Sequence, residues 1–213
     1  MYQHLSIFLH KSQLNSGCFL TNELAIGYFT HEKGKYNDTR LASGDFIQEN
    51  DRKEEFVMIK VLFVCLGNIC RSPMAEAMFR DLVKREGLEG KVVVDSAGTG
   101  DWHVGKPPHE GTRKILEQYG VNSEGLKARQ VTTADFNEFH YIIGMDATNI
   151  ENLKKLATPS DQLVVKRLMD FVDQEGKKDV PDPYFTGNFN ETYDLVTAGC
   201  QALLNHIKVV HNL

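Results

Sequence analysis

Two cysteines and an arginine stand close together in a short segment whose residue types suit nucleophilic chemistry. The segment reads Cys65-Leu66-Gly67-Asn68-Ile69-Cys70-Arg71-Ser72-Pro73. A thiolate is a strong nucleophile, and a guanidinium group can bind two phosphate oxygens through parallel hydrogen bonds. An arginine six residues after a cysteine is common by chance. The meaning of this pair therefore depends on the structure around it.

The segment lies between a predicted strand and a predicted helix. Residues 59–65 form a β-branched apolar run, which is typical of a buried parallel strand. Ser72 and Pro73 suit the N-cap and the first position of a helix, which we expect to end at Gly87. A loop that enters a helix N-terminus directs backbone N–H groups inward and forms an anion site.

Several residues of this loop have a role in such a site. Gly67 and Asn68 are the residues best able to adopt positive φ values in a tight cradle. The positive field favours the thiolate form of Cys65, which would attack the phosphorus of a bound phosphate and form a phosphocysteine. Ser72 has two compatible interpretations, as a helix cap and as a hydroxyl donor to the thiolate. The plain alternative is a buried cysteine that precedes an ordinary capped helix.

Hydrolysis of an aryl phosphate also needs an acid that protonates the leaving oxygen, which contributes about 10²- to 10⁴-fold. The segment Val180-Pro181-Asp182-Pro183-Tyr184 offers a candidate. Its two prolines stiffen the turn and hold the Asp182 carboxyl outside a helix. Taken alone, an Asp-Pro pair is more often a plain turn. Asp179 is the second candidate for the acid.

The rest of the pattern predicts an α/β domain. Further strands are expected at 91–96, 141–145 and 163–168, and helices near 111–119 and at 147–156. The last helix has apolar residues at steps of three and four, and Asn188 with Glu191 suits a capping box before it. Strands that alternate with helices imply an open parallel sheet covered on both faces, with ligands at the carboxyl ends of the strands.

The chain changes character near residue 57. Residues 1–57 show no sustained period of 2 or 3.6 and can bury little surface against their ordering entropy. We expect them to form an irregular extension that is disordered or that precedes the natural start at Met58. Residues 58–213 are expected to form one folded domain.

Composition excludes several classes of protein. No apolar run approaches the roughly 20 residues that span a bilayer, and the N-terminus does not resemble a secretory signal. The net charge of -5 argues against a nucleic acid partner. Cysteines occur at 18, 65, 70 and 200, too few and too irregular for a disulfide scaffold, and no Cys/His cluster has zinc spacing. We therefore expect a cytoplasmic protein that does not bind membranes.

The loop from Cys65 to Pro73 resembles the signature loop of the low-molecular-weight protein tyrosine phosphatases of bacterial type. The similarity extends over about residues 58–210. It implies a four-stranded parallel sheet with helices on both faces, the flavodoxin- or Rossmann-like phosphotyrosine phosphatase I fold, and no metal or other cofactor. By the same resemblance Cys65 is the nucleophile, Arg71 the transition-state clamp, and Asp182 the general acid in the family's Asp-Pro-Tyr signature.

The resemblance also implies which residues surround these three. Asn68 and Ser72 support the loop, Ser96 supplies a supporting hydroxyl, and Asp146 is a structural carboxylate. The phosphate-binding loop comprises Leu66, Gly67, Asn68, Ile69, Cys70 and Ser72. Trp102, Tyr184 and Phe185 are expected to line a deep cleft that suits a phosphotyrosine ring.

One departure from the family concerns the residues behind the loop. Many relatives have a histidine before the segment that matches Lys127-Ala128-Arg129, and this chain has Leu126 there. The hydrogen-bond network must therefore close differently, for example through water. His103 and His109 are expected to be solvated loop residues, and neither is assigned to catalysis.

The two remaining cysteines of the predicted domain have different expectations. Cys70 is close enough in the loop to form a reversible disulfide with Cys65, which would protect the nucleophile from over-oxidation. The alternative is a small apolar filler. Cys200 falls on the apolar stripe of the last helix and is expected in the core.

Three other functions share parts of this pattern. A thiol-dependent arsenate reductase also needs a downstream pair of cysteines, and only Cys200 follows Met145. The protein-arginine phosphatases of the same family tend to have threonine where this chain has Ile69. Isoleucine at this position better fits an aryl ester. A phosphocysteine carrier or redox switch would not require both Arg71 and Asp182. The prediction is therefore a monomeric enzyme that acts on phosphotyrosine-containing proteins.

Overall fold

The computed structural model describes residues 57–156, 159–172, 176 and 178–213. The extension predicted for residues 1–57 lies outside the described residues except for Val57, and so does Cys18. The two expectations for this extension stay untested predictions.

Four strands form one parallel sheet in the order β2-β1-β3-β4. They are β1 (Ile59–Cys65), β2 (Val92–Gly98), β3 (Tyr141–Gly144) and β4 (Val164–Arg167). The helices that connect and follow them are α1 (Arg71–Arg85), α2 (Glu110–Gln118), α3 (Asp135–Glu138), α4 (Ala147–Leu156), the 3-10 helix η1 (Leu168–Phe171), α5 (Pro183–Thr186) and α6 (Phe189–His211). The predicted fold class is confirmed.

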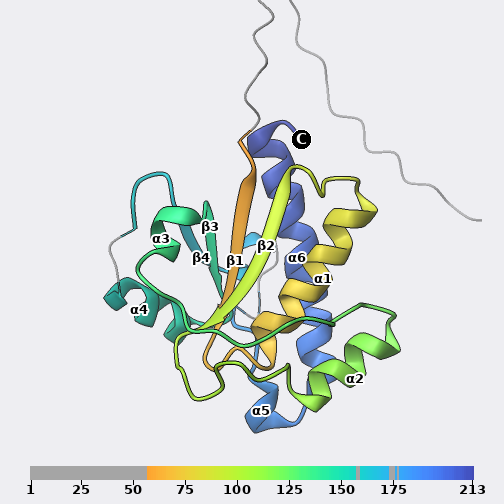
Figure 1. Cartoon of the computed structure of the whole chain (residues 1–213). Coiled ribbons are helices and arrows are strands. Elements are labelled where there is room, and N and C mark those ends of the chain that lie inside the picture. The colour runs from red at the N-terminus through yellow and green to blue at the C-terminus, as the bar shows by residue number, and fades with distance from the viewer. Residues whose placement is uncertain (1–56, 157–158, 173–175, 177) are drawn as a thin grey trace, which may run out of the picture. The chain divides into compact units, whose positions relative to one another are not determined.

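Helices cover both faces of the sheet (Figure 1). Alternate residues of β1 belong to the two cores on these faces. Val61, Phe63 and Cys65 belong to the larger core, which includes the apolar sides of α1 and α6. Leu62 and Val64 belong to the smaller core, under α3 and α4. This division follows from the period of two along a strand, and it explains why β1 is apolar at nearly every position.

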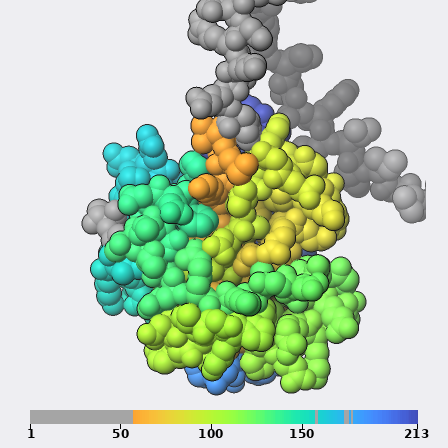
Figure 2. All heavy atoms as spheres, viewed as in Figure 1, coloured from red at the N-terminus to blue at the C-terminus, as the bar shows by residue number. Residues whose placement is uncertain are grey.

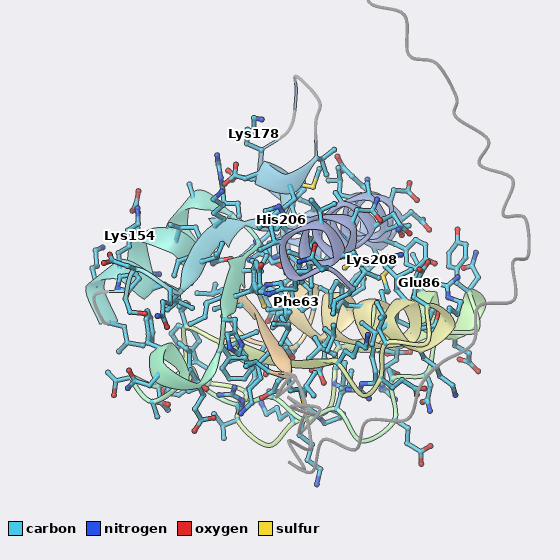
Figure 3. The ribbon with its side chains drawn as sticks, turned by 90° about the horizontal axis from the view of Figure 1, so that it is seen from above. Phe63, Glu86, Lys154, Lys178, His206 and Lys208 are labelled. Atoms are coloured by element: carbon cyan, nitrogen blue, oxygen red, sulfur yellow. The ribbon has the colours of Figure 1, made fainter. Side chains whose placement is uncertain are left out.

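The larger core is closed by α1 and α6, which pack side by side. Phe63 lies in this interior, where its ring contacts Phe79 of α1 at a centroid distance of 5.4 Å (Figure 3). At the surface, Lys208 of α6 donates to Glu86 at the end of α1 over 2.8 Å (Figure 3). The two helices are therefore joined by apolar packing inside and by an ion pair outside.

Most predicted elements appear with bounds within a few residues of those expected. The main correction concerns the start of α1, because its N-cap is Cys70 and Ser72 lies inside the helix. Ser72 was expected to cap this helix, and that interpretation is wrong. The short helices α3, α5 and η1 were not predicted, since each of four residues is too short to show a helical period.

Candidate active site

The loop between β1 and α1 presents free N–H groups at the carboxyl end of the sheet. Several of its carbonyl groups are occupied: those of Cys65, Leu66 and Ile69 accept from the backbone N–H groups of Thr99, Gly100 and His109. The N–H groups of residues 66–70 donate to no acceptor among the described residues. Unpaired N–H groups at the N-terminus of a helix form a site for an anion.

Three separate segments surround this loop at one end of the molecule. They are the segment after β2, α2 and α5, which lie together at the lower end of the views in Figures 1 and 2. A cavity of about 180 Å³ opens there, lined by Cys65, Leu66, Gly67, Ile69, Cys70, Trp102, His103, Asp182, Tyr184 and Phe185. The structure therefore brings together the expected nucleophile, the expected acid and the expected aromatic walls.

Cys65 is buried at the floor of this cavity beside a hydroxyl group. The Oγ atom of Ser72 lies 3.1 Å from the Cys65 Sγ atom and 3.2 Å from the carbonyl oxygen of Ala97. Because the side chain of Asn68 donates to the same Oγ atom over 2.9 Å, the Ser72 proton is free to point to sulfur. The interpretation of Ser72 as a hydroxyl donor agrees with this geometry.

Arg71 is held by two carboxylates. Its Nη1 atom donates to Asp146 over 2.5 Å and to the Val180 carbonyl oxygen over 3.2 Å, and its Nη2 atom donates to Asp182 over 2.7 Å. Burial opposes the charged form, but attraction to Cys65 and Asp182 and the hydrogen bond to Asp146 outweigh it, so the pKa of Arg71 is raised. The Nε atom is buried and has no partner among the described residues.

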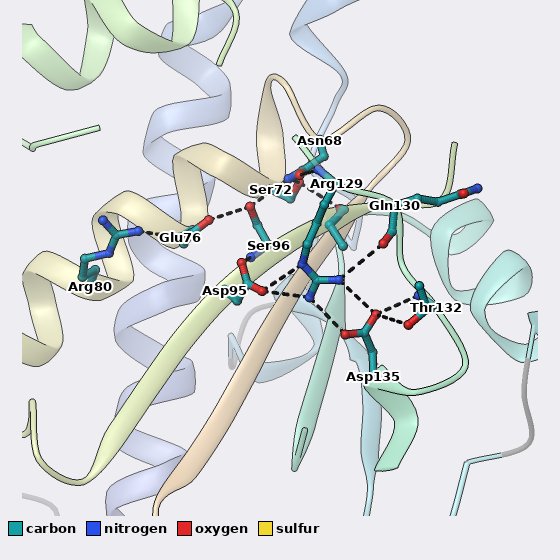
Figure 4. Close-up of polar contacts among 11 residues, drawn as sticks. Asn68, Ser72, Glu76, Arg80, Asp95, Ser96, Arg129, Gln130, Thr132 and Asp135 are labelled. Atoms are coloured by element: carbon teal, nitrogen blue, oxygen red, sulfur yellow. Dashed lines mark hydrogen bonds and ion pairs between the residues drawn. The ribbon is translucent and has the colours of Figure 1, made fainter. Parts of the chain in front are cut away.

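A chain of hydrogen bonds runs from the loop to the side of α1 (Figure 4). Asn68 donates to Ser96 over 2.8 Å, Ser96 donates to Glu76 over 2.7 Å, and Glu76 is paired with Arg80. Asn68 has a φ of 53°, as expected, and its Oδ1 atom accepts from the backbone N–H of Arg129 over 2.9 Å. Gly67 has no positive φ, so that part of the expectation is wrong.

The Arg129 side chain holds the segment before α3 against β2 (Figure 4). Its guanidinium donates to Asp95 over 2.9 Å and to both carboxylate oxygens of Asp135 over 3.0 and 3.1 Å. Burial opposes the charge of Arg129, but the two aspartates raise its pKa. These contacts fix the position of the Arg129 backbone N–H, which donates to Asn68, and so they support the loop.

The departure at Leu126 is resolved by these contacts. Leu126 is buried in the larger core. The network behind the loop closes through Ser96, Glu76 and Arg80 (Figure 4). Burial raises the pKa of Glu76, while the contacts with Ser96 and Arg80 oppose that rise.

The two candidate acids occupy different places. Asp182 lines the cavity, caps α5 by accepting from the Tyr184 N–H over 3.1 Å, and contacts Arg71. Asp179 is exposed and accepts from Arg167 over 3.2 Å and from the Ala147 N–H over 3.1 Å. The geometry therefore favours Asp182 as the acid.

The aromatic residues stand at the rim of the cavity. Trp102, Tyr184 and Phe185 are 66, 56 and 75% exposed. Tyr184 and Phe185 contact each other edge to face, with centroids 5.4 Å apart. Exposed aromatic faces around an anion site suit an aryl phosphate ester.

The other cysteines differ in their surroundings. Cys70 lines the cavity, and burial together with the negative groups Asp182 and Cys65 raises its pKa to about 12. Cys200 is buried in the larger core, as expected, and burial raises the pKa of its thiol. Cys200 does not line the cavity that contains Cys65 and Cys70.

The two histidines near the cavity were expected to be solvated, whereas both are only partly exposed. His109 accepts from the Gly111 N–H over 3.1 Å as the N-cap of α2, and its ring stacks on Phe189. His103 lines the cavity, and its Nδ1 atom is buried. Its position directly after Trp102 was a signal that the sequence contained.

The sequence pattern of the family described as low molecular weight phosphotyrosine protein phosphatase matches residues 60–212. The chain belongs to this family. Its expected enzyme class, a protein-tyrosine-phosphatase and hence a hydrolase, is confirmed. The phosphatase resembles the low molecular weight protein-tyrosine-phosphatase YfkJ of Bacillus subtilis, with 56% identity over 151 residues, 71% of this chain and 97% of the relative.

Other relatives cover a similar part of this phosphatase. The low molecular weight protein-tyrosine-phosphatase PtpA of Staphylococcus aureus is 42% identical over 156 residues, 73% of this chain and 98% of its own. The crystal structure of YfkJ matches with a TM-score of 0.69 and 55% identity, over 71% of this chain and 96% of that one. The Drosophila arginine phosphatase DARP matches with a TM-score of 0.66 and 36% identity, over 70% and 98% of the two chains.

No helix in the described part of the chain is long and apolar enough to span a membrane.

Proposed function

We propose that this phosphatase hydrolyses phosphotyrosine in proteins through a phosphocysteine intermediate. Cys65 attacks phosphorus, and the P–O bond to the tyrosine oxygen breaks while Asp182 gives its proton to that oxygen. Water then attacks the phosphocysteine, the P–S bond breaks, and the Asp182 carboxylate takes the proton from the water. Inorganic phosphate is released as a product, and the Cys65 thiolate and the protonated Asp182 are regenerated.

One observation carries this proposal: Cys65 and Asp182 line one cavity, Arg71 is paired with Asp182, and the loop N–H groups donate to no acceptor among the described residues. An anion with oxygens around one centre would occupy those groups, and Arg71 would bind two of its oxygens. The charge that develops on the oxygens in the transition state would meet donors that are already in place. Two thiols line the cavity: Cys65 lies beside the Ser72 hydroxyl, whereas burial raises the pKa of Cys70, so Cys65 is the preferred nucleophile.

The substrate class follows from the rim and from the loop. Trp102 and Tyr184 present aromatic faces above the anion site, which suits a flat aryl ester. Ile69, buried against Ala128, occupies the loop position where the protein-arginine phosphatases tend to have threonine. The aryl ester is therefore preferred to phosphoarginine as the substrate. The monomeric state and the cytoplasmic location stay predictions.

Turnover of a phosphotyrosyl peptide, of p-nitrophenyl phosphate and of phosphoarginine, measured in EDTA, tests the substrate class. We expect the first two to be hydrolysed, and phosphoarginine to be turned over at least about 10²-fold more slowly. Cys65→Ser should remove activity, while binding of inorganic phosphate stays measurable because the cradle is mostly backbone. Trapping by acid quench should show phosphate attached to Cys65. Activity above a few per cent in Cys65→Ser would contradict the mechanism.

A further inference from the structure

His103 lies deeper in the cavity than the aromatic residues around it. It is partly buried, whereas its neighbour Trp102 is 66% exposed. The turn that carries it is fixed, because the His103 carbonyl accepts from the Lys106 N–H over 2.9 Å and Gly105 donates to Ala128 over 2.7 Å. The ring is therefore held at the level of the phosphate-binding loop.

One edge of the His103 ring rests against Gly67. A Cβ atom added to Gly67 would stand 3.0 Å from the ring Cδ2 atom and 3.7 Å from Nε2. Gly67 is not among the residues with a positive φ, so the constraint at this position is space: a Cβ atom there would press on the His103 ring unless the ring moved by a few tenths of an ångström. The Nε2 atom therefore lies near Gly67, and both residues line the same cavity.

The two ring nitrogens are in different environments. Nδ1 is excluded from solvent and has no hydrogen-bond partner among the described residues. Nε2 also has no partner there, yet it is not among the solvent-excluded atoms, so it is open to the cavity. A neutral imidazole carries its hydrogen on one nitrogen, and a buried N–H without an acceptor is rarer than an unfilled acceptor. The hydrogen therefore belongs on Nε2.

We propose that His103 is a substrate-binding residue whose Nε2–H group donates to a phosphate oxygen of the bound phosphotyrosyl group. This inference rests on the proposed function. The phosphate is preferred to the flanking peptide as the acceptor because Nε2 lies at the loop, whereas the rim residues Tyr184 and Phe185 are 56 and 75% exposed. The phosphate would then accept hydrogen bonds from the backbone N–H groups of the loop and from one side chain outside it, His103.

Two variants separate the donor from the packing of the ring. His103→Phe keeps a flat ring against Gly67 but has no donor. His103→Gln places an amide nitrogen near the position of Nε2. Binding of inorganic phosphate is measured by calorimetry, and KM and kcat are measured with p-nitrophenyl phosphate and with a phosphotyrosyl peptide. Loss of one neutral hydrogen bond should weaken binding about three- to tenfold.

We expect His103→Phe to raise the phosphate dissociation constant and both KM values by that factor, with kcat within about twofold and an unchanged melting temperature. His103→Gln should restore most of the loss. The proposal is overturned if His103→Phe binds phosphate as wild type does, if only the peptide is affected, or if both variants lose affinity and melt earlier. A wild-type protein that binds phosphate but hydrolyses neither ester would contradict the proposed function instead.

Discussion

The Nη2 atom of Arg71 lies 2.7 Å from the Oδ2 atom of Asp182. The residue assigned to grip the phosphate is thus paired with the residue assigned to protonate the leaving group. A bound phosphate would compete with Asp182 for this guanidinium group, while Asp146 would keep Arg71 oriented through the Nη1 atom. Binding of substrate therefore releases the acid for its own task.

The first prediction concerns that acid. Asp182→Ala should lower kcat on a phosphotyrosyl peptide by at least about 10²-fold, because the leaving oxygen loses its proton donor. The alkaline limb of the pH–rate profile should disappear with it. Steady-state kinetics from pH 5 to 9 check both effects.

Asp179→Ala is the matched control for this experiment. Asp179 is an exposed aspartate in the same segment, but it pairs with Arg167 and does not line the cavity. Its replacement should change kcat less than about threefold. A larger loss of kcat in Asp179→Ala than in Asp182→Ala would show that Asp179, and not Asp182, is the general acid.

The second prediction concerns oxidation of the cavity thiols. Because the pKa of Cys70 is raised to about 12, Cys70 stays a neutral thiol, and peroxide should oxidise Cys65 first. Peroxide converts Cys65 to the sulfenic acid; the Cys70 sulfur then attacks the Cys65 sulfur, the S–O bond breaks, and the hydroxyl group leaves as water with the Cys70 proton, which forms a Cys65–Cys70 disulfide. Dithiothreitol should restore activity to the wild type but not to Cys70→Ala. Equal recovery of the two proteins would show that Cys70 only fills space.

The third prediction separates two properties of Asn68. Its side chain makes hydrogen bonds to Ser72, Ser96 and the Arg129 N–H, and its φ is 53°. Asn68→Gly loses the hydrogen bonds but tolerates the φ value, whereas Asn68→Ala also strains the backbone. We expect Asn68→Ala to be about 1 kcal/mol less stable than Asn68→Gly in urea unfolding. Both should reduce kcat about tenfold or more, and equal stabilities would contradict the role of φ.

The fourth prediction concerns stability in acid. The Nδ1 atom of His140 accepts from the Lys60 N–H over 3.0 Å, and burial, His211 and Lys60 lower the pKa of His140. The unfolded chain therefore binds a proton more readily than the fold. Stability should be fully present above about pH 6.5 and should fall as the pH falls through the lowered pKa. His140→Asn should flatten that fall, and parallel curves for the two proteins from pH 7 to 5 would refute the assignment.

The fifth prediction has the opposite sign. Burial raises the pKa of Glu76, so the fold binds a proton more readily than the unfolded chain. Ionisation of Glu76 should therefore lower stability as the pH rises above about 4.5 through the raised pKa. The unfolding free energy of Glu76→Gln relative to wild type should increase over that range. A constant or decreasing difference would mean that Arg80 and Ser96 fully compensate the buried charge.

Local pattern was sufficient for most of the fold and for the centre of the site. The apolar run at 59–65 and the turn residues after it predicted both the strand and the loop, because buried strands and helix starts have local signatures. Asp182 was harder, since an Asp-Pro pair alone indicates only a turn. Its assignment depended on the family resemblance.

The contacts that the sequence did not predict are made between distant segments. His103 touches Gly67 across 36 positions of the chain, and the Arg129 N–H meets Asn68 across 61. Nothing in the period or composition of either segment encodes such a meeting. The start of α1 was misplaced for a related reason: Ser72 has the residue type of a cap, but its hydroxyl is engaged by Cys65 and Asn68.

Residues 68–72 surround the nucleophile Cys65. They are buried and lie at the junction of β1 and α1. A region bound in this way has no low-energy route to open by itself. On heating, catalytic activity and folded structure should therefore be lost in the same transition. No temperature should give an enzyme that is folded but inactive. Weakening the remote Lys208–Glu86 contact should then lower the half-inactivation temperature by the same amount as the melting temperature. The stability of the whole domain would then set the temperature range over which the enzyme is active.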